Sequence, residues 1–193
     1  MLRACKLLRR MKCLALTISV LSFVSAANTS ASEHSVPEPD HYRTDTYKAP
    51  VPATLKGARV AGTKEVAELW EQKAAVFLDV MPRLPKPVLP AGTIWRDKPR
   101  LNIPGSIWLA NVGYGEITKE TEDYFKAGLA ANTGGDRSRK IVIYCMTDCW
   151  MSWNAAKRAV GWGYTAVIWY PDGADGWERA NHPLVTATPF AIH

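Results

Sequence analysis

The sequence predicts an α/β protein with a central, mostly parallel sheet that is flanked by helices. Four short apolar runs, at residues 75–80, 107–109, 141–144 and 166–169, have the continuous hydrophobicity of strands buried on both faces. Segments with a helical spacing of apolar residues lie between these runs. Because parallel neighbours need long crossover connections, this alternation favours right-handed βαβ units.

Three helices are expected, one before the first of these strands and two between later ones. The first opens at Thr63, whose side chain suits an N-cap. The second spans 118–131 and stops before the glycine pair 134–135. The third opens near Ser152. The residues expected on the inward faces of the three helices are Val66, Leu69, Trp70, Tyr124, Phe125, Leu129, Ala155, Ala156, Ala159 and Val160.

The first 26 residues have the layout of a secretory signal peptide. Residues 1–12 carry five Lys or Arg side chains and no acid, an uncharged and mostly apolar run covers 13–27, and Val24-Ser25-Ala26 marks the best cleavage site. The apolar run is shorter than the roughly 20 residues that a membrane span needs. We therefore predict a cleaved signal peptide over residues 1–26, with an uncleaved N-terminal anchor as the alternative.

Cleavage at this site would remove most of the net charge of +6. Five of the 24 basic residues and none of the 18 acidic ones lie in 1–26, so the cleaved chain would keep 19 basic and 18 acidic residues. A nearly neutral chain lacks the basic footprint of nucleic-acid-binding proteins, so we expect no nucleic-acid partner. Without a second long apolar segment, we also expect no stable membrane insertion after cleavage.

The rest of the chain divides into an arm, a domain and a tail. Residues 27–54 are polar, contain four prolines and show no period, so we interpret them as an extended N-terminal arm or linker. The folded domain is expected over 55–185 and a C-terminal tail over 186–193. Inside the domain, six of the thirteen prolines fall within 82–104, which predicts an irregular excursion over the surface. Its cations Arg96, Lys98 and Arg100 are expected on a solvated face, or against an acidic partner.

Both cysteines of the predicted mature chain lie in one short loop. Cys145 follows a buried strand and Cys149 precedes a helix, and this edge of a parallel sheet is where ligands bind. The helix N-terminus favours an anion, so a cysteine there is expected to have a lowered pKa. We predict Cys145 as the attacking sulfur and Cys149 as the resolving thiol. The residues expected around them are Met146, Thr147, Asp148, Trp150, Met151 and Ser152, with Asp79 at a strand end as a candidate supporting residue.

A structural disulfide is the alternative reading of this pair. Two cysteines left in a secreted chain often form one. A disulfide that closes so short a loop would stabilise the fold by roughly 2 kcal/mol or less. Such a small gain in stability is a weak reason to place both thiols at an anion-binding position.

The run IVIYCMTDCWMSWNAAKRAVGWGYTAVIWYPDGADGW resembles the C-terminal half of a rhodanese-like domain. The matching features are a strand that leads into a cysteine loop, a helix of small residues, Gly163-Tyr164, and a glycine-rich turn that ends at Trp177. Upstream, Phe77-Leu78-Asp79-Val80 and Ile103-Pro104-Gly105-Ser106-Ile107 are similar to the Asp-Val strand and the Ile-Pro-Gly segment of that family. The resemblance covers residues 55–185.

A narrower resemblance adds a location and a context. The cysteine pair followed by Trp150, the segment 111–115 and the leader are similar to a periplasmic rhodanese-like group with a cysteine-pair-Trp motif. That group is associated with alcohol oxidation that depends on pyrroloquinoline quinone (PQQ) in Gram-negative bacteria. The resemblance implies that Cys145 is the persulfide-forming position. It also implies a departure, because Trp150 stands where the family usually has Arg or Lys and Asp148 adds a negative charge, so an anionic donor is less favoured.

These observations predict a periplasmic sulfurtransferase or thiol–disulfide exchanger that is accessory to quinoprotein alcohol oxidation. Its expected partners are a small sulfur donor or thiol substrate and components of the PQQ-dependent system. We expect no cofactor and no resident metal. One alternative is a non-catalytic module that binds a partner protein or a soft metal such as Cu(I) between Cys145 and Cys149. A second alternative is a silent scaffold in which the cysteines form a structural disulfide.

Overall fold

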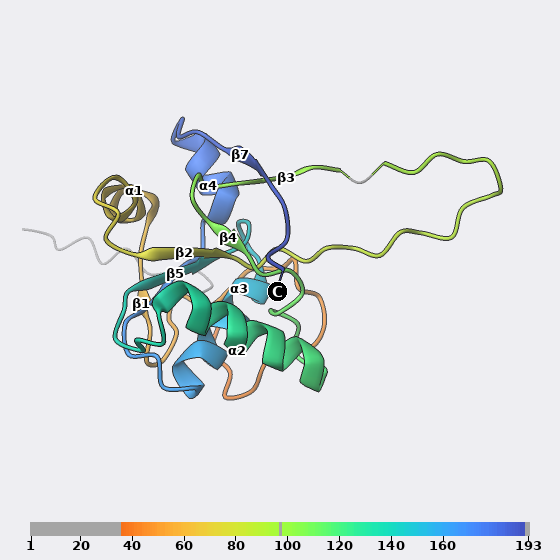
Figure 1. Cartoon of the computed structure of the whole chain (residues 1–193). Helices are drawn as coiled ribbons and strands as arrows, with labels where there is room; N and C mark the ends of the chain where they lie inside the picture. The colour runs from red at the N-terminus through yellow and green to blue at the C-terminus, as the bar shows by residue number, and fades with distance from the viewer. Residues whose placement is uncertain (1–35, 97, 192–193) are drawn as a thin grey trace, which may run out of the picture. The chain divides into compact units, whose positions relative to one another are not determined.

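Five parallel strands form the central sheet of the computed structural model, which describes residues 36–96 and 98–191. The strands lie in the order β1-β6-β5-β2-β4, and every neighbouring pair is parallel (Figure 1). The predicted α/β fold with a mostly parallel sheet is therefore confirmed. The strand bounds are Arg59–Val60 for β1, Val167–Tyr170 for β6, Ile141–Tyr144 for β5, Val76–Asp79 for β2 and Ile107–Trp108 for β4.

Four described helices cover the two faces of this sheet (Figure 1). One face carries α1 (Thr63–Glu71) and α4 (Gly173–Arg179), and the other carries α2 (Lys119–Thr133) and α3 (Trp150–Gly161). The strands between them must therefore be apolar on both sides, which explains why they read as continuous hydrophobic runs in the sequence.

Strand β5 shows how one segment serves both faces. Ile141 and Ile143 belong to the core cluster on the α2 and α3 side, whereas Val142 and Tyr144 belong to the cluster on the α1 and α4 side. All four side chains are fully buried. Successive residues of a strand point to opposite faces, so this central strand anchors both halves of the core.

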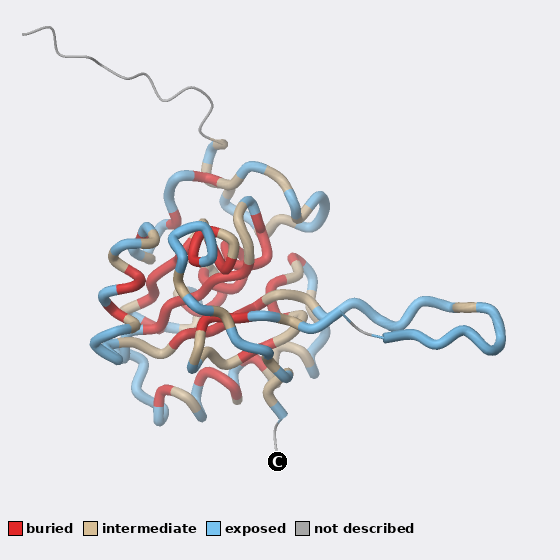
Figure 2. Tube along the Cα trace, turned by 90° about the horizontal axis from the view of Figure 1, so that it is seen from above, coloured by how far each residue is buried: buried red, intermediate tan, exposed pale blue. Residues whose placement is uncertain are grey.

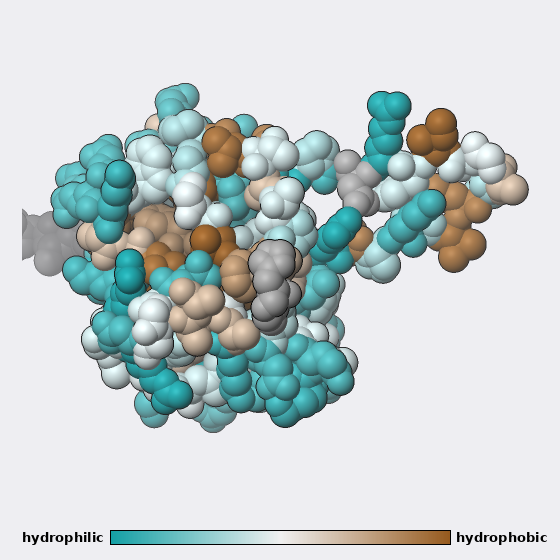
Figure 3. Space-filling model, in the orientation of Figure 1, coloured by the Kyte–Doolittle hydropathy of each residue, from teal (hydrophilic) through white to brown (hydrophobic). Residues whose placement is uncertain are grey.

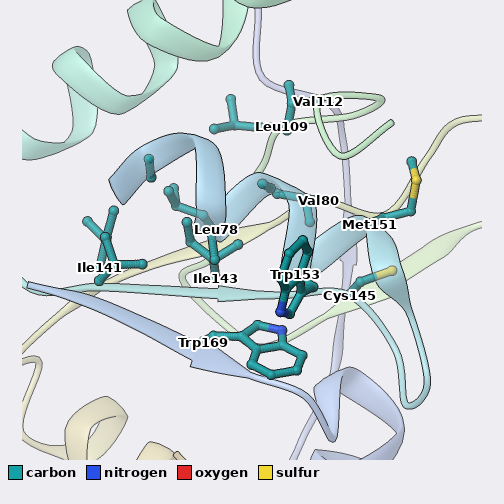
Figure 4. Packing of buried hydrophobic residues seen from close by; sticks show 14 of the residues in the cluster. Leu78, Val80, Leu109, Val112, Ile141, Ile143, Cys145, Met151, Trp153 and Trp169 are labelled. Carbon is teal, nitrogen blue, oxygen red and sulfur yellow. The ribbon is translucent and has the colours of Figure 1, made fainter. Parts of the chain in front are cut away.

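The core beneath α3 is built around two tryptophans. Figure 4 shows the indole rings of Trp153 and Trp169 beside each other, with Cys145 at the edge of the same cluster. The Trp169 Nε1–H donates to Ser152 Oγ at 3.0 Å, and the Trp153 Nε1–H donates to the Thr54 carbonyl at 3.2 Å. Both ring N–H groups are thus satisfied inside the apolar core, as buried indoles require.

Helix α2 is found where the sequence predicted it, but it covers Lys119–Thr133 instead of 118–131. Thr118 is its N-cap, with the side-chain oxygen accepting from the Thr121 N–H, and Gly134 ends it in the left-handed conformation at φ 66°. Glycine adopts this conformation without steric cost, so the chain turns away at the end of the helix.

The predicted starts of the other two helices need correction. Thr63 is the first helical residue of α1 rather than its N-cap, because its hydroxyl bonds to Tyr170 Oη and Asp172 and the cap position falls to Gly62. Helix α3 begins at Trp150, two residues before the predicted Ser152. This earlier start makes Cys149 the N-cap of α3.

The proline-rich segment confirms the predicted surface excursion but ends in a strand that the sequence analysis missed. No helix or strand occurs in the described residues between β2 and β3, and most of residues 82–99 that are described are exposed (Figure 2). At its end, β3 (Arg100–Asn102) pairs antiparallel with β7 (Val185–Ala187) in a separate two-stranded sheet. Strands of three residues carry too short an alternation to be recognised from sequence.

The arm is not a free linker in its described part. Residues 36–54 form no helix, yet they belong to the same compact unit as the domain, and Val36 pairs with Pro52. The predicted signal peptide and residues 27–35 lie outside the described residues, as do the last two residues of the predicted tail. Among the described residues, no helix is long and apolar enough to cross a membrane.

Candidate functional site

The cysteine loop lies at the C-terminal edge of the parallel sheet. Cys145 follows the last residue of β5, and Cys149 precedes the first residue of α3. Asp148, between them, adopts a positive φ of 52°, which an Asp tolerates better than most residues. This turn brings the two sulfurs within hydrogen-bonding reach of each other.

The two thiols occupy different electrostatic environments. Cys145 is fully buried, and Cys149 is 5% exposed. The neighbouring Cys145 thiol and nearby backbone N–H groups favour the charged form of Cys149 and lower its pKa to about 7, against the opposing effect of burial. Burial raises the pKa of Cys145 well above its ordinary value, and the neighbouring Cys149 and Asp79 raise it further.

Of the two cysteines, the lowered pKa belongs to Cys149, whereas the sequence analysis named Cys145 as the attacking sulfur. Cys149 is the N-cap residue of α3 but makes no side-chain capping hydrogen bond, so the helix favours a thiolate there through the positive end of its dipole. Burial favours the protonated form of Cys145, whose thiol donates to Met81 Sδ at 3.5 Å. In the structure both cysteines are free thiols.

The other predicted loop residues divide into two groups. Thr147 faces α4, where its hydroxyl donates to the Asp172 carbonyl at 2.8 Å and its N–H donates to the Asp175 carboxylate at 3.3 Å. Met146 pairs with Gly173 on the same side, and Asp148 is exposed. The second group, Trp150, Met151 and Ser152, is buried in the core.

Trp150 and Trp153 lie in the core and not at the surface of the loop. Trp150 is 2% exposed and Trp153 is fully buried, so neither presents a flat apolar surface to a partner. The two rings pack edge to face with centroids 5.4 Å apart, as aromatic pairs prefer. They support the loop from inside the fold.

Asp79 holds a structural position beneath the cysteine loop. Its carboxylate is fully buried and accepts from Arg100 Nε at 2.7 Å, from Arg100 Nη2 at 3.1 Å and from the Met81 N–H at 2.9 Å. Arg100 Nη2 also donates to the Cys145 carbonyl at 3.1 Å. The Asp79–Arg100 pair thus joins the end of β2 to the start of the cysteine loop, although burial raises the pKa of Asp79 against the opposing effect of Arg100.

Arg100 was assigned wrongly from the sequence. It was expected on a solvated loop face, but its side chain is only 13% exposed and forms the ion pair with Asp79. A cation that ends a proline-rich run looks like a surface residue unless its distant carboxylate partner is known. The sequence analysis also missed Met81, whose Sδ lies 3.5 Å from the Cys145 Sγ.

A segment of the arm crosses the cysteine loop, and we name residues 43–54 the strap. The Tyr47 carbonyl accepts from the Trp150 N–H at 2.9 Å, and the Ala49 N–H donates to the Asp148 carbonyl at 3.0 Å. Lys48 pairs with Cys149 as an antiparallel bridge, and its ammonium donates to the Thr147 carbonyl. The strap therefore covers the residues that flank Cys149.

Asn154 ties the strap and the segment 111–115 to α3. Its amide donates to the Arg43 carbonyl at 2.8 Å and to the Gly113 carbonyl at 2.9 Å, and its Oδ1 accepts from the Arg43 N–H at 2.9 Å. Gly113 approaches α3 so closely that a Cβ there would lie 2.4 Å from the Met151 carbonyl oxygen. Only a residue without a side chain permits this contact.

Among the described residues, no group of three or more His, Cys, Asp or Glu side chains is placed to hold a metal ion. The sulfur atoms at the site are the thiols of Cys145 and Cys149 and the neighbouring thioether of Met81. The described arrangement is therefore that of a shielded dithiol with one stabilised thiolate, which suits sulfur–sulfur exchange chemistry.

The rhodanese-like domain profile matches residues 63–180, and the chain belongs to the rhodanese-like domain family. This match includes the whole path from α1 through the cysteine loop to α4. It confirms the family resemblance seen in the sequence.

Solved structures with a similar fold include sulfurtransferases. A thiosulfate sulfurtransferase from Pseudomonas aeruginosa is 17% identical with a TM-score of 0.49, and the match covers 70% of this chain and 22% of that one. The polysulfide-sulfur transferase of Wolinella succinogenes is 17% identical with a TM-score of 0.44, and the match covers 71% and 85% of the two chains. A rhodanese-like domain from Anabaena is 17% identical with a TM-score of 0.44, at 69% and 86% coverage. No match is found among the curated proteins.

The first prediction from this site concerns Asp79. Asp79→Asn leaves the Arg100 guanidinium buried without its counter-charge, and we expect the free energy of unfolding to fall by about 3–5 kcal/mol. Urea denaturation measures this loss. The matched control is Asp123→Asn, because Asp123 forms an exposed ion pair with Lys119 on α2 and should change stability little. Equal effects of the two substitutions would contradict the role of the Asp79–Arg100 pair.

The second prediction concerns pH. Thiolate absorption near 240 nm should rise with a midpoint at about pH 7, where Cys149 deprotonates. The folded state then holds fewer protons than the unfolded state between pH 7 and the ordinary thiol pKa near 8.5. Stability should therefore rise through that window and fall as the pH drops through 7.

Two variants assign this transition. Cys149→Ser should abolish the transition near pH 7. Cys145→Ala should move it upward, because the hydrogen bond from the Cys145 thiol is the largest cause of the lowered pKa. A midpoint that survives in Cys149→Ser would show that the stabilised thiolate belongs to another residue.

Proposed function

We propose that the protein is a periplasmic, rhodanese-like sulfurtransferase or thiol–disulfide exchanger that works through Cys149 and Cys145. The observation that supports this most is the asymmetric pair of free thiols in one short loop, with Cys145 fully buried and Cys149 at the N-cap position of α3. A stabilised thiolate beside a protonated thiol can attack a sulfur and then resolve the adduct. The proposal exchanges the roles expected from the sequence, since Cys149 is both the more acidic and the less buried thiol.

The exchange reaction balances with these two residues alone. The Cys149 thiolate attacks one sulfur of a substrate R–S–S–R′, a mixed disulfide forms, and R′–S⁻ leaves. Cys145 then gives up its proton to R′–S⁻ or water and attacks Cys149 Sγ, which forms the Cys145–Cys149 bond and expels R–S⁻. The pair loses two electrons and the substrate disulfide gains them.

Sulfur transfer uses the same first step. With a persulfide donor R–S–S⁻, the Cys149 thiolate attacks the terminal sulfur, R–S⁻ leaves, and Cys149 keeps the extra sulfur for an acceptor. No net oxidation occurs in this transfer.

The surroundings of the loop favour small thiol, disulfide or persulfide substrates over thiosulfate-like anions. Asp148 adds a negative charge to the loop, and the buried Trp150 supplies no cation. Lys48 and Arg179 approach the loop from outside it, but their hydrogen bonds go to the Thr147 carbonyl and hydroxyl. Neither of these two hydrogen bonds is made with a sulfur atom.

The location and the biological context are part of this proposal. The leader over residues 1–26 supports export to the periplasm, and the cysteine-pair-Trp motif supports a link to PQQ-dependent alcohol oxidation. Components of that oxidation system are the proposed protein partners. We propose an accessory role there, in which the protein exchanges sulfur or disulfides with a component of the system.

One observation favours a second candidate, the binding of Cu(I). The Met81 thioether beside Cys145 adds a third soft sulfur to the two thiols, and soft sulfur ligands favour Cu(I). In this role the pair would hold the metal and perform no exchange.

The decisive experiment is intact mass analysis of the mature protein after exposure to glutathione disulfide or to inorganic polysulfide. Wild-type protein should end as the Cys145–Cys149 disulfide, Cys145→Ser should accumulate a mixed disulfide or persulfide on Cys149, and Cys149→Ser should lose most reactivity. An adduct on Cys145 in Cys149→Ser would restore the roles expected from the sequence. If all three proteins stay unmodified, the exchange proposal fails, and a native mass that includes copper would favour the second candidate.

A further prediction concerns the strap, which must move aside before a substrate reaches Cys149. Lys48→Ala removes the ammonium contact with Thr147, so alkylation of Cys149 by iodoacetamide should become about two- to fivefold faster. Lys64→Ala, an exposed lysine on α1, is the matched control and should leave the rate unchanged. Identical rates in both variants would show that this contact does not limit access.

A further inference from the structure

The exposed loop between β2 and β3 has an apolar tip that the proposed sulfur chemistry does not use. Residues 87–95 contain no charged side chain. Val88 is fully exposed, Ile94 is 81% exposed and Leu84, just before the tip, is 72% exposed. Figure 3 shows hydrophobic groups on both edges of the projecting loop, among hydrophilic ones. Large apolar side chains exposed together in this way mark an interaction site.

Basic residues flank this tip on both sides. Arg83 and Lys86 precede it, and Arg96 and Lys98 follow it, against the single acid Asp97, which lies outside the described residues. We name these four cations the basic collar. The tip is uncharged and lies between two pairs of cations. This charge distribution is expected of a segment whose apolar part contacts lipid chains while its cations contact anionic headgroups.

The backbone of the tip suits entry into a less polar medium. Pro87 and Pro90 have no N–H group, and the Thr93 N–H already donates to the Pro90 carbonyl at 3.1 Å within a turn. Backbone donors that lack a partner are a principal cost of entering the membrane region. This tip carries fewer of them than an ordinary loop of nine residues.

The loop also lacks the regular shape that a protein pocket would recognise. No helix or strand fixes the relative positions of its apolar side chains in the described residues. A fluid lipid interface accepts such scattered anchors, whereas a protein hot spot is compact and well packed.

We propose that this loop docks the protein onto an anionic lipid surface. The tip enters the headgroup and acyl boundary, and the basic collar binds lipid phosphates. The attachment is peripheral and reversible, and it involves no spanning segment. The proposal is independent of the sulfur chemistry, since it rests on residues 83–98 alone.

Co-sedimentation of the mature chain with vesicles tests the proposal. Vesicles of phosphatidylglycerol and phosphatidylethanolamine should bind the protein, and vesicles of phosphatidylcholine should bind it at least tenfold more weakly. Each collar substitution, Lys86→Gln, Arg96→Gln or Lys98→Gln, should weaken binding about fivefold, with less effect at high salt. The double variant Val88→Ser/Ile94→Ser should weaken it at both salt concentrations.

Matched controls separate docking from general surface effects. Val185→Ser changes another half-exposed apolar side chain, and Lys140→Gln removes a cation outside the loop. Both should bind like the wild type, and all variants should keep the thiolate midpoint at about pH 7, which reports on the site independently. The proposal is overturned if the wild type does not bind anionic vesicles, if both lipids bind it equally, or if the tip variant binds unchanged. Loss of vesicle binding with intact exchange activity would leave the proposed function standing.

Discussion

The buried ion pair between Asp79 and Arg100 is the interaction on which the arrangement of the site depends. Asp79 ends the strand β2 beside the central strand β5, and Arg100 begins the small sheet that lies apart from it. The guanidinium bonds to the carboxylate and to the Cys145 carbonyl, so one cation fixes both the strand end and the cysteine loop. Burying two charged side chains costs desolvation free energy, and removing one of them leaves the other buried without its counter-charge. The position of the first cysteine is therefore set by a residue 45 positions earlier in the chain.

The second constraint is the early start of α3. Because the helix begins at Trp150, the residue at its N-terminus is Cys149 rather than Cys145, and the helix dipole favours a thiolate there. The same apolar core that holds Trp150 and Trp153 isolates Cys145 from water and keeps it protonated. One helix terminus and one hydrophobic cluster thus give two chemically identical side chains opposite tendencies.

The fold was predictable because its signals are local. The apolar runs of β2, β5 and β6 and the cap of α2 are each visible within a few neighbouring residues, and the cysteine loop follows from their order. The errors arose where a distant partner decides the outcome. The hydroxyl of Thr63 bonds to Tyr170 instead of capping its helix, Arg100 pairs with a carboxylate 21 residues away, and the strap binds a loop about 100 residues later. The pKa of each cysteine depends on such contacts, so the sequence alone could not tell which of the two thiols has the lower pKa.

Both ends of the proline-rich loop are held by the same residue, so the loop should tolerate insertions and substitutions. Met81 at one end and Arg100 at the other bond to the same Asp79 carboxylate, so the two ends are held together whatever lies between them. The entropy of closing a loop grows only slowly with its length. Residues between these ends can thus be lengthened, shortened or replaced at little thermodynamic cost to the thiol pair. This region is therefore where relatives of the protein would be free to differ, and where a label or affinity tag could be placed.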